Sequence, residues 1–293
     1  MNVPLVNFNN RTNKDAQFEI VDLEELAKRA SSLQHSPESP HRVSFFAVIY
    51  IQKGAGTHTI DFVDHTFEKD TILFIQREQV HSYDFSQHPK GSVLLFTQAF
   101  LDQVHANMRL PSYTPTHLDF QYQPAIKLNE DLALSVQHLI EEMLKETARK
   151  HCDPLILMYL FSSLSLMLHR ERPESRQDKM SKEQNQRFAR FFTLLQENYS
   201  SIRDANWYAN QVHTTYKTLN QVCKLATNLT AKQLIDSYTI LEIKRRLVLK
   251  DNTIQHLAYE LGFEDASNFV KYFKKHTGHT PTQFQKMHIN PHL

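Results

Sequence analysis

The chain has 293 residues, of which 41% are hydrophobic and 22% charged, and its formal net charge is +1. This length allows two domains with separate cores, and the composition is that of an ordinary globular protein rather than a disordered or fibrous one. No apolar run reaches the ~18–20 residues of a membrane span, and residues 1–10 lack the pattern of a secretory signal. We therefore expect a cytoplasmic protein with no membrane partner.

The charged residues are unevenly distributed along the chain. From Lys179 to the C-terminus there are 16 Lys and Arg against 9 Asp and Glu, an excess of 7 positive charges, whereas the rest of the chain has an excess of 6 negative charges. A difference of this size also arises by chance, but a basic part joined to an acidic part suggests a polyanion partner for the basic part. The two cysteines, Cys152 and Cys223, have no metal-binding spacing, which fits a reducing compartment.

Residues 45–97 carry the pattern of short β-strands. The runs that are rich in β-branched and aromatic residues or alternate in polarity are Phe45–Ile51, Thr57–Val63, Thr71–Ile75 and Val93–Thr97, with turn chemistry at residues 53–56. Strands at a spacing of roughly ten residues predict a small antiparallel barrel or sandwich.

Two helices and a linker are predicted after the strands. Apolar residues recur at helical spacing from Leu132 to Leu144, which predicts a helix over 130–146, and a second helix follows Pro154. The apolar stripe of the first helix is wide enough to pack on the barrel or on a second copy of itself. Residues 171–182 are charged and have no apolar period, so we predict a linker there between an N-terminal domain, 1–170, and a C-terminal domain, 183–293.

The C-terminal domain is predicted to be helical, and two of its segments share one plan. In each, a short helix with a small residue, Ala209 or Ala258, meets a tight turn, and a capping side chain, Thr215 or Asp265, starts another helix. Gly262 gives the second turn the backbone freedom that it needs. This is the helix-turn-helix plan, in which the second helix presents its N-terminal part to the DNA major groove.

One long amphipathic helix is predicted between the two segments, over residues 231–249. Its length of about 27 Å can hold two recognition helices roughly one DNA turn, about 34 Å, apart, so that each enters a successive major groove. The expected fold is α+β with two domains: an N-terminal antiparallel β-barrel with flanking helices, and a C-terminal all-α domain with two helix-turn-helix motifs joined by a long helix.

The run from Ile254 to Pro281, IQHLAYELGFEDASNFVKYFKKHTGHTP, resembles the signature of AraC/XylS-type transcription regulators. The pieces WYA, TLN and CK, which begin at Trp207, Thr218 and Cys223, resemble the first motif of the same family, and the whole resemblance covers about 105 residues. Three positions depart from the family pattern, in which Gly, Arg and Tyr are frequent: Asn228, Tyr238 and Asn268. The first motif is the less similar of the two.

The exposed beginnings of the two recognition helices are the predicted DNA contacts, because side-chain amides can pair with adenine and lysines can reach guanine or phosphate. The predicted base contacts are Tyr216, Lys217, Asn220 and Gln221 in the first motif and Ala266, Ser267, Asn268 and Lys271 in the second. The predicted phosphate contacts are Lys224, Lys274, Lys275, Thr214, Thr215 and Thr282. Individual members of this set could instead be ordinary solvated helix residues.

The segments Lys53–Asp61 and Phe74–His81 resemble the cupin-like sensor domain often joined to such regulators, which implies a small-molecule effector of unknown identity in the barrel. The predicted lining is Phe46, His58, Ile60, Phe74, His81 and Tyr83, although these residues could equally fill the core. A catalytic cupin metal needs a His-x-His pair, a carboxylate and a later histidine, whereas the two segments supply only His58 and His81. We therefore expect no metal and no cofactor.

The leading hypothesis is a bacterial transcription regulator without enzymatic activity that binds double-stranded DNA and responds to a small-molecule effector. The resemblance also implies a homodimer, formed through the helix over 130–146, and activation by contact with RNA polymerase. One alternative is a cupin-type metal-dependent enzyme with an accessory helical domain, which stoichiometric bound metal would favour. Another is a helical protein-interaction module, which would leave the basic excess and the repeated capped turns unexplained.

Overall fold

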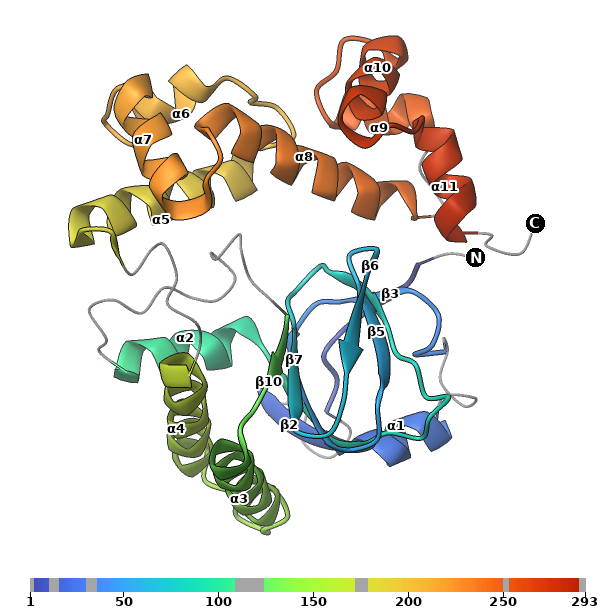
Figure 1. Ribbon diagram of the computed structural model, residues 1–293, viewed down its shortest axis with the longest axis vertical. Coiled ribbons are helices and arrows are strands. Elements are labelled where there is room, and N and C mark those ends of the chain that lie inside the picture. Colours follow the sequence, from blue (N-terminus) through green and yellow to red (C-terminus); the bar gives the residue numbers. More distant parts are fainter. Residues whose placement is uncertain are drawn as a thin grey trace. The chain divides into compact units, whose positions relative to one another are not determined.

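The computed structural model describes residues 3–10, 16–29, 36–108, 124–171, 179–249 and 253–289. These residues divide into two compact units, the N-terminal unit (residues 3–108 and 124–171) and the C-terminal unit (residues 179–249 and 253–289) (Figure 1). The N-terminal unit combines β-sheets with helices and the C-terminal unit is helical, so the predicted α+β class with two domains is confirmed.

Two five-stranded sheets form the β part of the N-terminal unit, within the residues described above. Their strand orders are β1-β3-β8-β5-β6 and β10-β7-β4-β9-β2, and each pair of neighbours is antiparallel except β1 and β3. The strands are β1 (Leu5–Val6), β2 (Phe18–Asp22), β3 (His41–Val43), β4 (Phe46–Lys53), β5 (Gly56–Ile60), β6 (Val63–Phe67), β7 (Thr71–Ile75), β8 (Val80–Ser82), β9 (Lys90–Phe96) and β10 (Ala125–Lys127).

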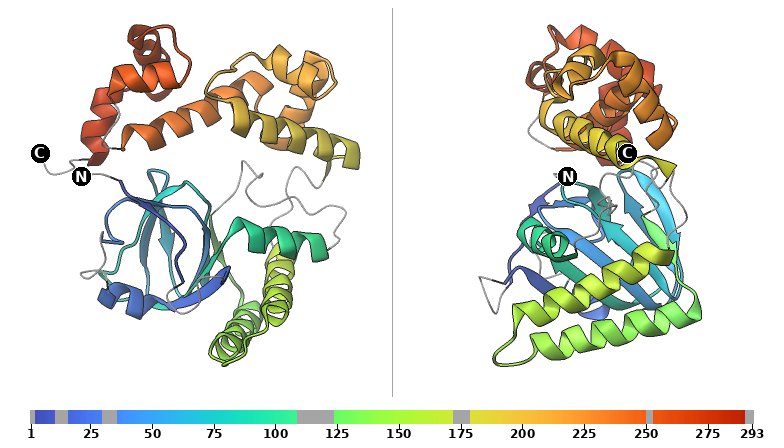
Figure 2. Two further views of the ribbon diagram at one scale, coloured as in Figure 1. Left: turned by 180° about the vertical axis from the view of Figure 1, so that it is seen from behind. Right: turned by 90° about the vertical axis from the view of Figure 1, so that its left-hand side faces the viewer.

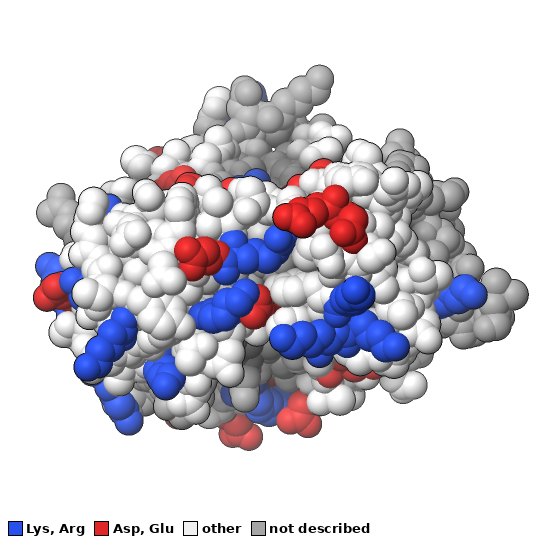
Figure 3. Space-filling view, turned by 90° about the horizontal axis from the view of Figure 1, so that it is seen from above, with Lys and Arg blue, Asp and Glu red and all other residues white. Residues whose placement is uncertain are grey.

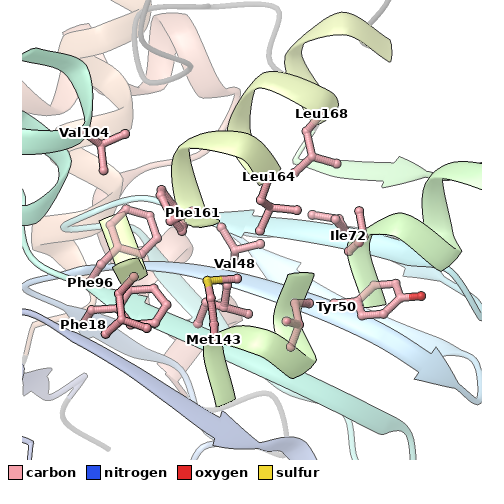
Figure 4. Close-up of a cluster of buried hydrophobic side chains, with 14 of the residues drawn as sticks. Phe18, Val48, Tyr50, Ile72, Phe96, Val104, Met143, Phe161, Leu164 and Leu168 are labelled. Atoms are coloured by element: carbon pink, nitrogen blue, oxygen red, sulfur yellow. The ribbon is translucent and has the colours of Figure 1, made fainter. Parts of the chain in front are cut away.

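Strand β4 lies in the middle of the second sheet and is buried on both faces. Its odd-numbered residues from Ala47 to Ile51 pack in one apolar cluster with residues of the first sheet, such as Ile60 and Phe67. Its even-numbered residues from Phe46 to Tyr50 pack in a second cluster with residues of the helices (Figure 4). A strand that is covered on both faces is apolar throughout, which explains the continuous run seen in the sequence.

Four helices, again counted within the described residues, accompany the sheets: α1 (Leu23–Arg29), α2 (Gln98–Met108), α3 (Glu130–Thr147) and α4 (Pro154–Glu171). Helices α3 and α4 lie side by side, and together with α2 they cover the second sheet (Figure 2). The predicted helices over 130–146 and after Pro154 are confirmed. The Asn129 side chain caps α3 by accepting a hydrogen bond from the Leu132 backbone N–H at 2.9 Å, and the Tyr50 hydroxyl donates to the Ala133 carbonyl oxygen of the same helix at 3.3 Å.

The predicted strand over Thr57–Val63 is wrong at its C-terminal end. Strand β5 ends at Ile60, and a tight hairpin turn at Asp61 and Phe62, with φ of 47° and 70°, leads into β6 at Val63. Two successive positive φ values are typical of a type I′ turn, for which Asn-Gly is the usual signal. The Asp-Phe pair carries no such signal, so the alternating pattern runs through the turn without a visible break.

The C-terminal unit contains, within its described residues, seven helices: α5 (Lys182–Asn198), α6 (Ala205–Gln211), α7 (Tyr216–Thr227), α8 (Ala231–Leu247), α9 (Ile254–Glu260), α10 (Ala266–Thr277) and α11 (Pro281–Ile289). The predicted long helix between the two segments is α8. Ala209 and Ala258 are buried in their motifs, whereas Trp207 is half-buried and packs against Tyr208. No helix in the described part of the chain is long and apolar enough to cross a membrane.

Candidate nucleic-acid interface

The turns of the two helix-turn-helix motifs, α6–α7 (first motif) and α9–α10 (second motif), begin with the same backbone. In each, two successive N–H groups, those of His213 and Thr214 or of Gly262 and Phe263, donate to carbonyl oxygens of the preceding helix at 2.9–3.0 Å. His213 and Gly262 are equivalent and both have a left-handed backbone, with φ of 52° and 66°. The turn therefore requires this conformation at one position, whichever residue occupies it.

The recognition helices α7 and α10 also end in the same way. The C-cap of α7 is Asn228, with φ of 66°, and the C-cap of α10 is Gly278, with φ of 79°. After glycine, asparagine is among the residues that adopt this conformation most readily, which explains why it can replace the family's frequent Gly here. The repeat continues into the next helix, because Thr230 with Gln233 and Thr280 with Gln283 form matching capping boxes.

Helix α7 has a buried side and an exposed polar side. The Thr215 hydroxyl caps the helix by accepting a hydrogen bond from the Thr218 N–H at 3.1 Å, and Leu219 and Cys223 are fully buried. The predicted contacts Tyr216, Lys217, Gln221 and Lys224 are all exposed, whereas Asn220 and Thr214 are half-buried.

An open groove runs along the exposed side of α7. Lys179, which precedes α5, lines it together with Lys217, Lys224 and the ring of Tyr216. Three cationic side chains beside an aromatic ring and the amide of Gln221 suit a strand of nucleic acid. Lys179 is not among the predicted contacts, because residue 179 falls in the predicted linker, and the only signal for it in the sequence is the excess of positive charge that begins there.

Helix α10 has the same two-sided arrangement with more lysines. The Asp265 carboxylate caps it by accepting a hydrogen bond from the Asn268 N–H at 2.7 Å, and Phe269 and Phe273 are fully buried. The remaining predicted contacts on α10 are exposed, except for Ala266, which is half-buried; the exposed ones are Ser267, Asn268, Lys271, Lys274 and Lys275. Thr282, at the beginning of α11, is exposed as well.

Two predicted adenine-reading amides already have partners inside the protein. The Asn220 carbonyl oxygen Oδ1 accepts a hydrogen bond from the Ala231 N–H at 2.9 Å and so holds the first turn of α8. The Asn268 amide donates to the Asp265 carboxylate at 3.0 Å. Gln221, by contrast, is exposed and has no side-chain hydrogen bond to any described residue. It is therefore the amide best able to pair with a base edge.

Both motifs lie on the same side of α8, one toward each end of that helix (Figures 1 and 2). Helix α8 has 17 residues and therefore a length of about 26 Å, which is shorter than the roughly 34 Å between successive major grooves on one side of a duplex but of the same order. Figure 3 shows this side of the C-terminal unit, on which Lys and Arg side chains form several clusters with a few acidic side chains between them.

A cluster of aromatic and imidazole rings lies inside the N-terminal unit. His58 Nε2 and His81 Nδ1 are 3.2 Å apart and share a hydrogen bond, and the ring of His41 lies 4.2 Å from that of His81 between centroids. Tyr83 meets His58 edge-on at 4.7 Å. Burial, together with the imidazoles of His41 and His65, lowers the pKa of His58 to about 3, so this ring stays neutral at physiological pH.

The six predicted effector-binding residues do not form one group. His58, Ile60, His81 and Tyr83 lie between the two sheets. Phe46 and Phe74 lie in the cluster that faces the helices, on the other side of the second sheet. The sequence could not assign the side of Phe46, because a strand buried on both faces has no polarity alternation. The interpretation of these two residues as barrel lining is therefore wrong.

The described residues contain no group of three or more His, Cys, Asp or Glu side chains that could hold a metal ion.

Two domain families match the chain. Residues 23–164 match the AraC-like ligand binding domain, and residues 208–287 match a helix-turn-helix domain. The transcriptional activator RhaS of Yersinia pestis bv. Antiqua (strain Angola) is 22% identical over 241 residues, which cover 82% of this chain and 86% of RhaS. RhaS of Yersinia pseudotuberculosis serotype O:1b (strain IP 31758) is likewise 22% identical with the same coverage.

Among solved structures, ToxT from Vibrio cholerae strain SCE256 with a bound unsaturated fatty acid matches at 14% identity, covering 96% of this chain and 97% of ToxT with a TM-score of 0.45. The domain families and the paired motifs define a DNA-binding transcription regulator with a separate ligand-binding domain. The chain belongs to the AraC/XylS-type family of these regulators.

Proposed function

We propose that the chain binds double-stranded DNA with α7 and α10 in successive major grooves and activates transcription in response to a small-molecule effector. The observation that supports this most strongly is the pair of matched motifs, each with an exposed polar recognition helix, on one side of α8. The domain roles follow: residues 1–170 bind the effector and dimerise, residues 171–182 link, and residues 183–293 bind DNA.

Each recognition helix makes base contacts through the residues at its beginning and phosphate contacts through flanking residues. Base edges are contacted by residues at the beginnings of α7 and α10: Tyr216, Lys217, Gln221, Ala266, Ser267 and Lys271. Phosphates are contacted by the flanking cations and hydroxyls, which position the protein without selecting a sequence: Lys179, Lys224, Lys274, Lys275, Thr215 and Thr282. Asn220 and Asn268 act mainly through the hydrogen bonds that shape their motifs.

Selection of bound sequences from a random duplex pool by the full-length protein tests this proposal. The enriched DNA should contain two short boxes with centres about 10 base pairs apart, and the affinity should fall steeply with salt because several phosphates are contacted. A Lys217→Ala, Lys271→Ala double variant changes only exposed side chains and should fold normally but enrich weakly. If the wild-type protein enriches no sequence and its DNA binding is insensitive to salt, the proposal is wrong.

The effector site is proposed between the two sheets, beside His41, His58, His81 and Tyr83, which combine apolar ring faces with a few polar atoms. Thermal unfolding of the full-length chain against a metabolite panel tests this, because a bound compound raises the melting temperature by mass action. The stabilisation should disappear in His81→Phe and remain in His138→Phe, which changes an exposed histidine of α3. An undiminished shift in His81→Phe would contradict the site.

Dimerisation is proposed through the outer surfaces of α3 and α4. Helix α3 buries most of its apolar stripe against α4 and the sheet, whereas α4 exposes Leu155 and Tyr159, each at 59%, and Leu166 at 39%. Exposed apolar side chains at helical spacing are typical of an interface with a second copy. Tyr159→Glu should sediment as a monomer at a concentration where the wild type is a dimer, and a dimer in both would contradict this interface.

The remaining parts of the proposal follow from family membership. The relatives are named transcriptional activators, which favours activation through contact with RNA polymerase over repression. The chain acts in the cytoplasm, where the DNA is, and has no enzymatic activity and no cofactor.

A further inference from the structure

The loop between α5 and α6, residues 199–204, contacts the turn of the second motif. The Arg203 guanidinium donates a hydrogen bond from Nη2 to the carbonyl oxygen of Leu261, the C-cap of α9. Its central carbon lies 3.9 Å from the centroid of the Phe263 ring, so the planar cation stacks on that ring. The segment before the first motif thus contacts the second motif directly, in addition to the covalent link through α8.

The backbones of the same two segments also lie in close contact. A Cβ atom added to Gly262 would lie 2.8 Å from the Ser200 carbonyl oxygen and 3.4 Å from the Ser201 Cα. Only a residue without a side chain allows this approach. The turn of the second motif is therefore packed against the loop that precedes the first motif.

Further hydrogen bonds connect Arg203 to the second recognition helix. The Tyr272 hydroxyl of α10 donates to Asp236 of α8 at 2.8 Å, and Lys232 donates to the same carboxylate oxygen at 2.7 Å. Lys232 also donates to the Arg203 backbone carbonyl oxygen at 3.5 Å, and the Arg203 guanidinium lies 5.8 Å from the Tyr272 ring. We call these connected side chains the Arg203 network: Arg203, Lys232, Asp236, Phe263 and Tyr272.

A second set of contacts lies further along α8 and joins the end of α5 to α9. Arg246 donates to the Tyr199 hydroxyl at 2.6 Å and pairs with Glu260 of α9 at 3.3 Å between Nη1 and Oε1. Tyr199 is the C-cap of α5, so this pair also joins the segment before the first motif to the second motif. Two sets of polar contacts therefore restrain the second motif against rotation about α8.

We propose that Arg203 is a positioning residue that sets the orientation of the second motif relative to the first, and thereby the spacing of DNA boxes that the protein accepts. This inference rests on the proposed DNA binding. When two linked binding elements have a fixed separation, binding of one raises the effective concentration of the other only for DNA with the matching spacing. Loosening the link weakens binding to the matching DNA and weakens discrimination against other spacings.

Arginine suits this position better than lysine would. The face of its planar guanidinium stacks on the Phe263 ring, and an N–H group at the edge of the same plane donates to the Leu261 carbonyl oxygen. A lysine ammonium is not planar and cannot make this combination of a stacked face and an in-plane hydrogen bond. Arg203 does not belong to the recognition helices, and it acts through the second motif rather than through a DNA contact.

The experiment uses the full-length protein and the DNA that the wild type selects from a random duplex pool. Dissociation constants are measured on this DNA and on copies with one or two base pairs inserted between the boxes. For the wild type, each insertion should weaken binding by about tenfold or more, because the second motif cannot follow the displaced groove. For Arg203→Ala, binding to the original DNA should weaken by about tenfold, and the further loss on insertion should fall to about threefold or less.

Two further variants make the result interpretable. Arg187→Ala removes an equal charge from α5, where Arg187 pairs with Glu183, and should keep the wild-type penalty for each insertion. Tyr272→Phe removes only the hydroxyl that donates to Asp236 and should reduce the penalty in the same direction as Arg203→Ala, by a smaller factor. If Arg203→Ala fails to fold, the insertion penalty of Tyr272→Phe tests the positioning role by itself.

The outcomes separate this inference from the proposed function. If the wild type selects two-box DNA but Arg203→Ala and Tyr272→Phe keep both the affinity and the insertion penalty of the wild type, the positioning role is overturned while DNA binding stands. If the wild type selects no DNA, both fail. An insertion penalty that falls equally in Arg187→Ala would also overturn the role, because charge rather than contact would then be the cause.

Discussion

The first and second helix-turn-helix motifs have left-handed residues at the same two places, early in the turn and at the C-cap of the recognition helix, but different residues occupy them. His213 and Asn228 adopt the left-handed conformation in the first motif, and Gly262 and Gly278 adopt it in the second. His213 is exposed, so its side chain has room, whereas the Ser200 carbonyl oxygen faces the position where Gly262 would carry a Cβ. The left-handed position is therefore common to both turns, and the neighbouring segments decide which residue each turn tolerates there.

The exposed sides of the two recognition helices differ more than their turns do. Helix α7 exposes a tyrosine and the unengaged amide of Gln221 in addition to two lysines. Helix α10 exposes three lysines, and its one amide, Asn268, is bonded to the helix cap. The first motif therefore has the richer set of groups for base recognition, although it is the one that departs further from the family pattern in sequence.

The largest expected effect is that of Gly262→Val. The positive φ strains a β-branched residue, and the new Cβ would collide with the Ser200 carbonyl oxygen at 2.8 Å. The free energy of unfolding of the C-terminal unit should fall by about 3 kcal/mol or more, measured by urea denaturation of the full-length chain. His213→Val has the same strain without the collision and should cost roughly half as much. Equal losses at the two positions would mean that strain alone sets the cost.

The next largest effects are expected from the loss of one base contact and of one phosphate contact. Gln221→Ala should weaken binding to the selected DNA by about tenfold or more and abolish the preference at one base pair. Lys274→Ala should weaken binding to all sequences alike and reduce the salt slope by about 1. Titrations at several salt concentrations, on the selected DNA and on single-base variants of it, distinguish the two. If Gln221→Ala instead weakens binding to the selected DNA and to all its single-base variants by the same factor, Gln221 does not recognise a base and the proposed difference between α7 and α10 is wrong.

A smaller effect is expected at the ends of the recognition helices. Gly278→Ala places a side chain at a φ of 79° with no atom within 4 Å of the new Cβ, so strain is the only cost, about 1 kcal/mol of unfolding free energy. Asn228→Gly, at the matching end of α7, should change the unfolding free energy by no more than about 0.5 kcal/mol. A large loss in Asn228→Gly would indicate that the asparagine side chain itself stabilises the first motif.

The smallest expected effect is a gain from His213→Gly. Glycine relieves the left-handed strain at φ of 52°, and this relief exceeds the added entropy of the unfolded chain by only about 0.5 kcal/mol. The melting temperature of the full-length chain should rise slightly. A clear decrease would show that the histidine side chain makes a stabilising contact in the turn.

The C-terminal unit could be predicted from the sequence in detail because its signals are local. The caps Thr215 and Asp265, the small residues Ala209 and Ala258, and the helical period all lie within a few residues of the elements that they define. The hydrogen bond between Asn220 and Ala231 spans eleven residues, so no local pattern could indicate that this amide is engaged.

The N-terminal unit was less predictable because its strands are short and its contacts are long-range. Strand β2 pairs with β9, whose residues lie 70 to 78 positions from their partners, and no short pattern around Phe18 indicates this. Because β4 is buried on both faces, its sequence does not indicate that Phe46 points toward the helices. The Arg203 network joins residues up to 69 positions apart, so it could be seen only once the fold was known.

The second turn of the repeat is one residue longer than the first. Equivalent residues are 49 positions apart before the turn, as with Ala209 and Ala258, and 50 positions apart after it, as with Lys224 and Lys274. An extra residue in a loop only lengthens it, whereas the same residue inside a helix would rotate every later side chain by about 100° around the helix axis. Placed inside α10, it would have turned Lys274 away from its present side. The two motifs therefore expose equivalent sides of their recognition helices despite the extra residue, because that residue lies in the turn between two helices.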